Sequence, residues 1–386
     1  MVAKRTRSST RSSKSHQSSK KDSNKYEEGT NFVAGGIEDN GPLFALAVCG
    51  PFVTILFGYL TSQSFKETGV APHLSTMLPI CYSDLSACAT KVFTAGMSTV
   101  YPLNIPAMQF ILGFMLVAFL LEFLPGKIET GPETGTGHIP EYRDNALLHC
   151  FTFSALFYLG SNLSLIPWFA TNGYDFGIMY DVFPSAVGFL NIFGILFCLF
   201  LTYKGLHFPS TGDSGSSGSY VKDFLWGTEL YPRLWGWWDL KRFVNCRFSM
   251  TFWQLAGLSF AYKSYTIHGE IDWGLTLSAV SQYLYLVKFF LWEMGYMRSI
   301  DIIVDRAGFE IQWGCLCFVP AVYTLCTRFC VQYPSGLSKE VAIALFILSL
   351  ISVALNYAAD REREIFRATD GKELVWGKPP EFIKAT

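Results

Sequence analysis

Charged residues are scarce in this chain of 386 residues. Asp, Glu, Lys and Arg make up 16% of it, whereas soluble domains average about 25%. Hydrophobic residues make up 50%, aromatic residues 16%, and the mean hydropathy is +0.27. This composition excludes an ordinary soluble domain and predicts a membrane protein. The net charge of −1 gives no reason to expect nucleic acid as a partner.

Common binding signatures are also absent from the sequence. The ten cysteines do not show metal-site spacing, and Cys315, Cys317, Cys326 and Cys330 lie in an apolar run without a nearby histidine. Buried thiols that behave as small hydrophobic side chains are the simpler interpretation, so no metal is expected. Neither GxGxxG nor GxxxxGK(S/T) occurs. The Gly/Ser-rich stretch 208–219 is therefore interpreted as a flexible connector rather than a phosphate-binding loop.

The chain alternates between long apolar runs and polar loops after a polar start. Residues 1–41 are rich in Ser, Lys and Arg, which predicts a disordered basic N-terminal tail with no signal peptide. A bilayer-spanning helix needs about 20 apolar residues. About eight runs meet this need, so the sequence predicts an all-α, polytopic transmembrane helical bundle over residues 42–358. The predicted spans are 43–62, 105–124, 147–168, 183–203, 248–266, 272–292, 310–331 and 340–358.

The basic residues are unevenly distributed among the loops. With the N-terminus in the cytosol, the tail and the loops 125–146, 204–247, 298–309 and 359–386 hold 24 of the 30 Lys and Arg residues. Cytosolic loops of membrane proteins are rich in Lys and Arg. The distribution therefore predicts a multi-pass protein with both ends of this chain on the cytosolic side.

Charged residues beside the predicted spans are candidates for function. Glu293 and Asp301 lie between two apolar, aromatic-rich runs, where charge is costly unless it is paired, hydrated or used. On a continuous helix, Tyr285 would lie within about 80° of Glu293 and about 60° of Lys288, forming one polar stripe. A tyrosine beside a cation can donate a proton. A tyrosine packed in the bundle with a satisfied hydroxyl group is the alternative.

A pair of arginines follows the last predicted span. Arg363 and Arg367 are four residues apart and so share one face of a helix. Two guanidinium groups on one face suit a ligand that carries phosphate. From spacing alone, an anchor on the cytosolic side, stabilised by ion pairs along the helix, is slightly favoured as the explanation of the pair.

Two further loop segments are expected to be ordered. Residues 124–145 contain many turn-forming residues together with the polar residues Lys127, Tyr142 and Asn145. Residues 223–243 are dense in tryptophan, which favours the interface between membrane and water. The second segment therefore fits an interfacial structural loop as well as a binding site.

The order of these segments resembles the membrane sterol reductases, and especially the plant-type Δ7-sterol reductases. The resemblance lies in the strings LPGK, GTELYPR, NCRF, WEMGY, DRAGF, WGCL and DREREIFRATDGKELVWGKPP, which begin at Leu124, Gly227, Asn245, Trp292, Asp305, Trp313 and Asp360. It covers the chain from about residue 43 onward.

The resemblance implies a multi-pass enzyme of the endoplasmic reticulum membrane. Such an enzyme uses NADPH to reduce the Δ7 double bond of Δ5,7-sterols in sterol biosynthesis. By the resemblance, Tyr285 is the proton donor, and Arg363 and Arg367 contact NADPH. Glu293 and Asp301 are carried over as pocket or structural polar residues. The sterol and the lipid bilayer are the expected partners.

The family pattern continues beyond Thr386, so the resemblance implies further spans and a larger cofactor region. Residues 359–386 are accordingly expected to be the cytosolic start of an NADPH-binding C-terminal region. Two other functions stay open at this point. They are a C14-sterol reductase and a non-catalytic, sterol-binding membrane scaffold.

Overall fold

The computed structural model describes residues 41–63, 96–163 and 165–381 and the single positions 66, 86, 90 and 94. The predicted basic tail lies outside the described residues, apart from its last position, Gly41, which opens the first helix. Most of the described chain is helical, and its strands form two small two-stranded sheets, which confirms the predicted all-α class.

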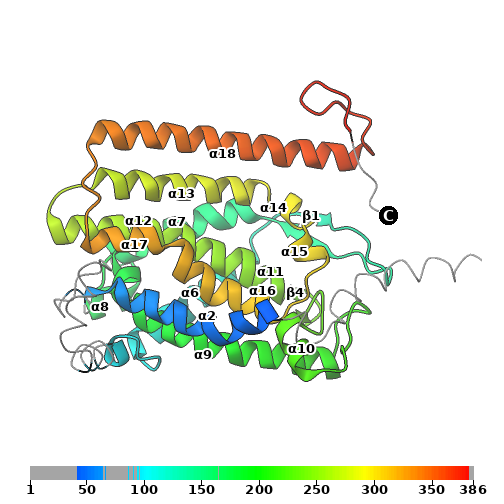
Figure 1. Ribbon diagram of the computed structural model, residues 1–386, viewed down its shortest axis with the longest axis horizontal. Helices are drawn as coiled ribbons and strands as arrows, with labels where there is room; N and C mark the ends of the chain where they lie inside the picture. The colour runs from blue at the N-terminus through cyan, green and yellow to red at the C-terminus, as the bar shows by residue number, and fades with distance from the viewer. Residues whose placement is uncertain are drawn as a thin grey trace, which may run out of the picture.

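Long apolar helices run side by side and form the body of the molecule (Figure 1). Hydrophobic residues of several of these helices meet in one large core, which contains many phenylalanines together with Trp313. Helix α18 lies on the outside of this body and packs on α13. The helices are α2 (Gly41–Leu60), α6 (Ile105–Leu121), α7 (Ala146–Asn162), α9 (Ile178–His207), α12 (Met250–His268), α13 (Trp273–Leu291), α17 (Leu325–Gln332) and α18 (Lys339–Ala368).

Seven of the eight predicted spans coincide with one of these helices, and the eighth, 310–331, covers a broken helical run that ends in α17. Fewer of the helices are clear membrane spans than predicted. Within the described part of the chain, four helices (α2, α9, α13 and α18) are long and apolar enough to cross a membrane. A bent pair, Phe309–Tyr323 with Leu325–Gln332, makes a fifth if it is one span. Helices α6 and α7 have 17 residues each, which is short for a crossing. The multi-pass prediction is confirmed, with four or five clear spans in place of eight.

The loops predicted to share the cytosolic side lie together at one end of the bundle, on the right of Figure 1. Helix α2 begins and α18 ends at this same end. The predicted ordered segments form two antiparallel hairpins here, in which Lys127 pairs with Asp144 and Arg233 with Asp239. The short elements at this end are β1 (Lys127–Thr130), β2 (Glu141–Asp144), α10 (Tyr220–Trp226), β3 (Arg233–Leu234), β4 (Trp238–Asp239), α11 (Leu240–Arg242), α14 (Glu293–Tyr296) and α15 (Ile300–Ile303), whereas α8 (Pro167–Asn172) lies at the other end.

Two segments of the core depart from α-helical geometry. The segments η2 (Phe243–Ser249) and η3 (Gly314–Tyr323) are π-helices that pack against each other. Helix α16 (Phe309–Trp313) leads directly into η3. Trp313 is fully buried there, and its indole nitrogen donates to Asn191 at 3.0 Å. Irregular backbone is tolerated at membrane depth where protein surrounds it, and π-helical turns are frequent at functional sites.

Close packing of two glycines fixes the loop after α10 against the start of α16. Gly227 has φ +102°, and a Cβ added to Gly308 would lie 2.3 Å from the Gly227 nitrogen. The neighbouring Gly/Ser-rich loop is held as well, because Arg306 donates to the Gly215 carbonyl at 2.8 Å and Asp223 accepts from the Ser217 amide at 2.7 Å. The expectation that 208–219 is a free connector is therefore wrong.

Candidate functional site

Tyr285 lies on α13 at the junction with α18. Its side chain is half-buried, its ring packs on Trp253 at 5.8 Å, and the Lys288 ammonium lies 5.9 Å from the ring centre. Among the described residues, no side chain or backbone group is hydrogen-bonded to its hydroxyl group. The predicted tyrosine–lysine pairing is therefore present.

Arg363 and Arg367 both lie exposed near the end of α18. The helix is continuous through both residues, so the predicted shared face is confirmed. Arg363 forms an ion pair with Asp360, one turn earlier, and its side chain is still 64% exposed. Asp360 also accepts a hydrogen bond from Lys288. The candidate proton donor Tyr285 and the candidate phosphate-binding residue Arg363 are thus linked through Lys288 and Asp360 at one junction of two helices, and Arg367 lies one turn further along α18.

Glu293 does not belong to this junction, so the prediction of one continuous polar stripe is wrong. Helix α13 ends at Leu291, and Glu293 begins the separate short helix α14. The change of direction takes the Glu293 side chain into the interior, where it is fully buried. Ion pairing with two arginines from another segment outweighs continuation of the helix.

A buried cluster of four charges surrounds Glu293, and we name it the charge cluster. Its members are Glu122, Arg242, Arg247 and Glu293. Arg242 and Arg247 each donate to Glu293 Oε2 at 3.0 Å. Arg247 Nε lies 3.3 Å from Glu122 Oε1, and Arg247 Nη2 donates to Asn145 Oδ1 at 3.0 Å. The two negative and two positive charges balance, as buried charges require.

Electrostatics in the charge cluster strongly favour ionised Glu293. Burial alone would raise the pKa of this carboxyl group, but Arg242 and Arg247 outweigh burial and lower its pKa to about 2. A carboxyl group held ionised in this way is a poor proton donor. The cluster, together with Asn145, links the end of α6, the β2–α7 turn, the α11–η2 segment and α14.

Asp301 lies exposed on α15, apart from the charge cluster. Tyr296 donates to Asp301 Oδ2 at 3.2 Å and accepts from Asn245 at 2.7 Å. Nearby, the buried ammonium group of Lys241 donates to the Ile302 carbonyl at 3.0 Å. Burial lowers the pKa of Lys241 to about 8, against the opposing effect of neighbouring carboxylates. The predicted residues Glu293 and Asp301 are therefore brought to the same end of the bundle but into different networks.

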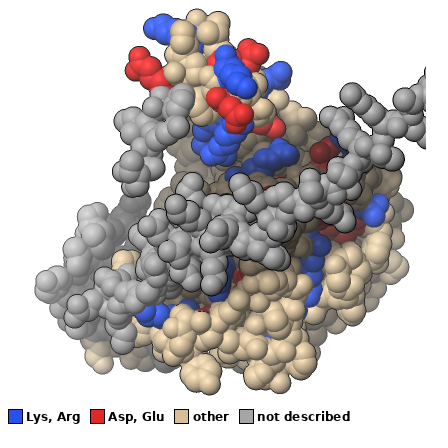
Figure 2. All heavy atoms as spheres, turned by 90° about the vertical axis from the view of Figure 1, so that its right-hand side faces the viewer, with Lys and Arg blue, Asp and Glu red and all other residues tan. Residues whose placement is uncertain are grey.

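Sequence reasoning did not single out several residues of these networks. Glu122, Arg242 and Arg247 were missed, although Arg247 stands within the quoted NCRF string. The available signal for Glu122 was a carboxylate inside the apolar run 105–124, which is costly unless it is paired. Figure 2 looks onto this end of the molecule, where basic and acidic side chains are interspersed, most densely near the end of α18.

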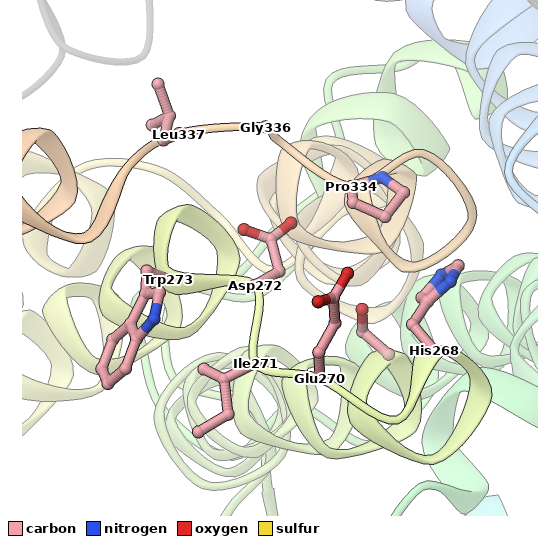
Figure 3. A pocket seen from close by; sticks show the side chains of 9 residues that line it. His268, Glu270, Ile271, Asp272, Trp273, Pro334, Gly336 and Leu337 are labelled. Atoms are coloured by element: carbon pink, nitrogen blue, oxygen red, sulfur yellow. The ribbon is translucent and has the colours of Figure 1, made fainter.

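Two of the hollows in the described part of the chain lie away from the junction. An apolar groove of about 270 Å³ lies among α6, α9 and η2 and includes Phe119 and Trp238. A mixed pocket of about 240 Å³ lies at the opposite end of the bundle, where Glu270 and Asp272 point toward the loop that contains Pro334 (Figure 3). The Asp272 carboxylate already has hydrogen-bond partners, because it caps α13 and accepts from the Ser335 amide at 2.7 Å. The described residues contain no group of His, Cys, Asp or Glu suited to a metal ion.

These features define a multi-pass helical membrane protein with a polar site at one end of its bundle. Comparison with known proteins identifies the family. The model of the Ergosterol biosynthesis ERG4/ERG24 family matches residues 44–385, so the chain belongs to this family, as the sequence motifs predicted.

The relatives include two kinds of sterol reductase. The chain is 39% identical over 269 residues to the 7-dehydrocholesterol reductase of Arabidopsis thaliana, covering 70% of this chain and 60% of the relative. It is 30% identical to the 7-dehydrocholesterol reductase of Xenopus laevis over 78% of this chain and 61% of the relative. It is 32% identical to the Delta(14)-sterol reductase of Methylotuvimicrobium alcaliphilum over 70% of this chain and 61% of the relative. The chain spans about 60% of the length of these relatives.

Proposed function

We propose that the protein reduces the Δ7 double bond of Δ5,7-sterols with NADPH. One observation carries the proposal: Tyr285 on α13 and Arg363 on α18 lie at the same helix junction, joined through Lys288 and Asp360. A sterol in the bilayer requires a proton donor at the depth of the membrane. A dinucleotide dissolved in water requires a phosphate-binding group at the polar end. The junction places both groups on neighbouring helices. The identity to 7-dehydrocholesterol reductases supports the choice of the Δ7 bond.

The chemistry requires two separate hydrogen deliveries. A carbon–carbon double bond without an electron-withdrawing substituent resists hydride, so an acid must first protonate one carbon of the double bond and leave a carbocation on the other. NADPH, when bound, supplies the hydride that this carbon receives. The acid must lie within hydrogen-bond reach of the alkene, and aromatic ring faces stabilise a nearby cation.

Tyr285 is the proposed acid. Its hydroxyl group has no hydrogen-bond partner among the described residues. The Tyr285 ring packs on Trp253, whose ring centre lies 4.9 Å from that of Tyr323. The Lys288 ammonium lies 5.9 Å from the centre of the Tyr285 ring. Replacement by phenylalanine keeps the ring and removes only the proton, so Tyr285→Phe should abolish turnover while NADPH binding remains.

Arg363 and Arg367 are the proposed NADPH contacts. The exposed guanidinium groups at the end of α18 fit phosphate, because each presents several donors in a planar fork. We expect Arg363→Gln and Arg367→Gln each to raise the KM for NADPH, with the larger loss at low salt, since screening weakens exposed charge contacts. Glu293 and Asp301 are proposed as polar residues that shape the site without donating a proton.

The proposed setting is the endoplasmic reticulum membrane, with the N-terminal tail in the cytosol. The end of the bundle that carries α14, α15 and the end of α18 would then face the cytosol, where NADPH is dissolved. In this proposal residues 42–358 form the membrane bundle and residues 359–386 begin the NADPH-binding region. The excess of Lys and Arg in the loops at this end supports the orientation.

A sterol profile tests the proposed function directly. The chain would be expressed in a host that accumulates Δ5,7-sterols, with Tyr285→Phe as the matched control, and sterols measured by gas chromatography–mass spectrometry. Conversion of the Δ5,7 diene to the Δ5 product by the unmodified chain alone is expected. An unchanged profile from protein shown to be inserted in the membrane would contradict the proposal and favour a sterol-binding scaffold.

Reduction of a Δ14 double bond is the second candidate function. The 32% identity to a Delta(14)-sterol reductase favours it. The same host strategy separates the two activities when a strain that accumulates Δ14-sterols is tested in parallel. Loss of the Δ14 bond with the Δ5,7 diene intact would replace the first proposal by the second.

A further inference from the structure

The ammonium group of Lys288 contacts both helices of the junction. It forms an ion pair with Asp360, donates to Asn356 Oδ1 at 2.6 Å, and lies 5.9 Å from the Tyr285 ring and 5.4 Å from the Trp292 ring. The Lys288 side chain is only 11% exposed. An ammonium group this enclosed needs its carboxylate partner, so the position of Lys288 is fixed by α18.

Asp360 is the inward-facing residue at the polar end of α18. Only Ala342 and Asp360 are buried along the whole helix. One carboxylate oxygen of Asp360 meets Lys288 and the other meets Arg363. Because the apolar surface of α18 is largely exposed, polar contacts of this kind set the position of its C-terminal end within the protein. The neighbouring hydrogen bond from Trp292 Nε1 to Glu364 Oε2, at 3.1 Å, holds the same region.

The charges of the three groups determine how Arg363 meets a phosphate. Asp360 and Arg363 alone have no net charge, and the carboxylate would repel an approaching phosphate. Lys288 adds one positive charge on the far side of Asp360, so that Lys288, Asp360 and Arg363 together carry a net charge of +1. Arg363 keeps donors free for a phosphate, because its side chain is 64% exposed.

We propose that Lys288 is a positioning residue for the dinucleotide: it neutralises Asp360, which in turn orients the Arg363 guanidinium toward a phosphate. This inference rests on the proposed function, since it takes NADPH as the ligand of Arg363. It differs from that proposal in assigning a role to two residues that do not themselves touch the cofactor.

The test measures NADP⁺ binding and steady-state kinetics of the purified chain in lipid nanodiscs. We expect Lys288→Met to weaken NADP⁺ binding and raise the KM for NADPH about tenfold, as expected for a partly lost charge-assisted hydrogen bond. The kcat should change little, because the contact with phosphate is the same in the ground state and in the transition state. Lys288→Arg keeps the charge and should bind NADP⁺ nearly as well as the unmodified protein.

A second substitution separates positioning from support of the fold. Asp360→Asn, introduced into Lys288→Met, removes the uncompensated carboxylate and should restore most of the lost NADP⁺ affinity. Arg363 then loses its carboxylate partner, but its side chain is 64% exposed, so no buried charge is left unpaired and the double variant serves even if Lys288→Met folds poorly. Ser281→Ala is the matched control, because Ser281 contacts Ser349 at 2.7 Å across the same two helices, away from the ion pairs.

The outcomes distinguish failure of this inference from failure of the proposed function. If the unmodified protein does not bind NADP⁺, the proposed function itself fails. If it binds, and Lys288→Met binds NADP⁺ with unchanged affinity and KM, the positioning role is overturned. The role is equally overturned if Lys288→Met loses affinity but the double variant does not regain it, because Lys288 would then act independently of Asp360.

Discussion

Replacement of Glu293 by glutamine tests the account of the charge cluster. The amide keeps the shape of the side chain but removes its charge, so Arg242 and Arg247 are left buried with Glu122 as the one remaining carboxylate of the cluster. The magnitude follows from the pKa, because the cluster lowers it from the ordinary value of 4.5 to about 2. At 1.36 kcal/mol for each pKa unit, the negative charge of Glu293 stabilises the fold by ~3 kcal/mol. Breaking a buried ion pair by removing one partner costs a similar amount, about 3–5 kcal/mol.

The assay is the free energy of unfolding in mixed micelles at neutral pH, followed by tryptophan fluorescence. Glu293→Gln should lower this free energy by ~3 kcal/mol. Glu129→Gln is the matched control, because Glu129 pairs with Lys127 on the surface, where ion pairs contribute little. A loss for Glu293→Gln no larger than that of the control would refute the electrostatic reasoning.

Other predictions follow from the same geometry. Lowering the pH from 4.5 to 2 should remove more stability from the unmodified protein than from Glu293→Gln, because a depressed carboxyl pKa stabilises the fold above 4.5 and the contribution of Glu293 is lost toward 2; parallel slopes would contradict this. Gly308→Ala should prevent folding, since the new Cβ would meet the Gly227 nitrogen at 2.3 Å, whereas Gly314→Ala, with open space around it, should fold normally in a size-exclusion assay. Lys241→Met should destabilise the fold by about 1–3 kcal/mol in chemical unfolding, because the Ile302 carbonyl loses its donor; no change would mean that water replaces the ammonium.

Local patterns in the sequence were sufficient for the class of fold, the family and the loops that share one end. Apolar runs locate helices because a run can be recognised without knowing which other segments pack against it. The i,i+4 spacing of Arg363 and Arg367 likewise needed only a continuous helix, and the structure provides one. The glycines of the GTELYPR and DRAGF strings are explained by the contact between Gly227 and Gly308, which the strings alone do not specify.

Tertiary pairing determined what local patterns could not show. Arg247 and Asn145 are 102 residues apart in the chain and hydrogen-bond in the interior, so no spacing rule connects them. The same pairing explains the break after Leu291: no proline interrupts the run there, and the burial of Glu293 against two arginines turns the chain. The Gly/Ser-rich composition of 208–219 is typical of linkers, but Asp223 and Arg306 hold the loop in place.

The origin of the hydrogen atoms in the product tests the central proposal most directly. A Δ5,7-sterol would be incubated with the protein in nanodiscs and with NADPH carrying deuterium at both C4 positions of the nicotinamide, and the product analysed by mass spectrometry. The account predicts a Δ5-sterol with one deuterium from NADPH, and a second when D₂O replaces water, with neither formed by Tyr285→Phe. A Δ5 product without deuterium from NADPH, or equal turnover by Tyr285→Phe, would contradict it.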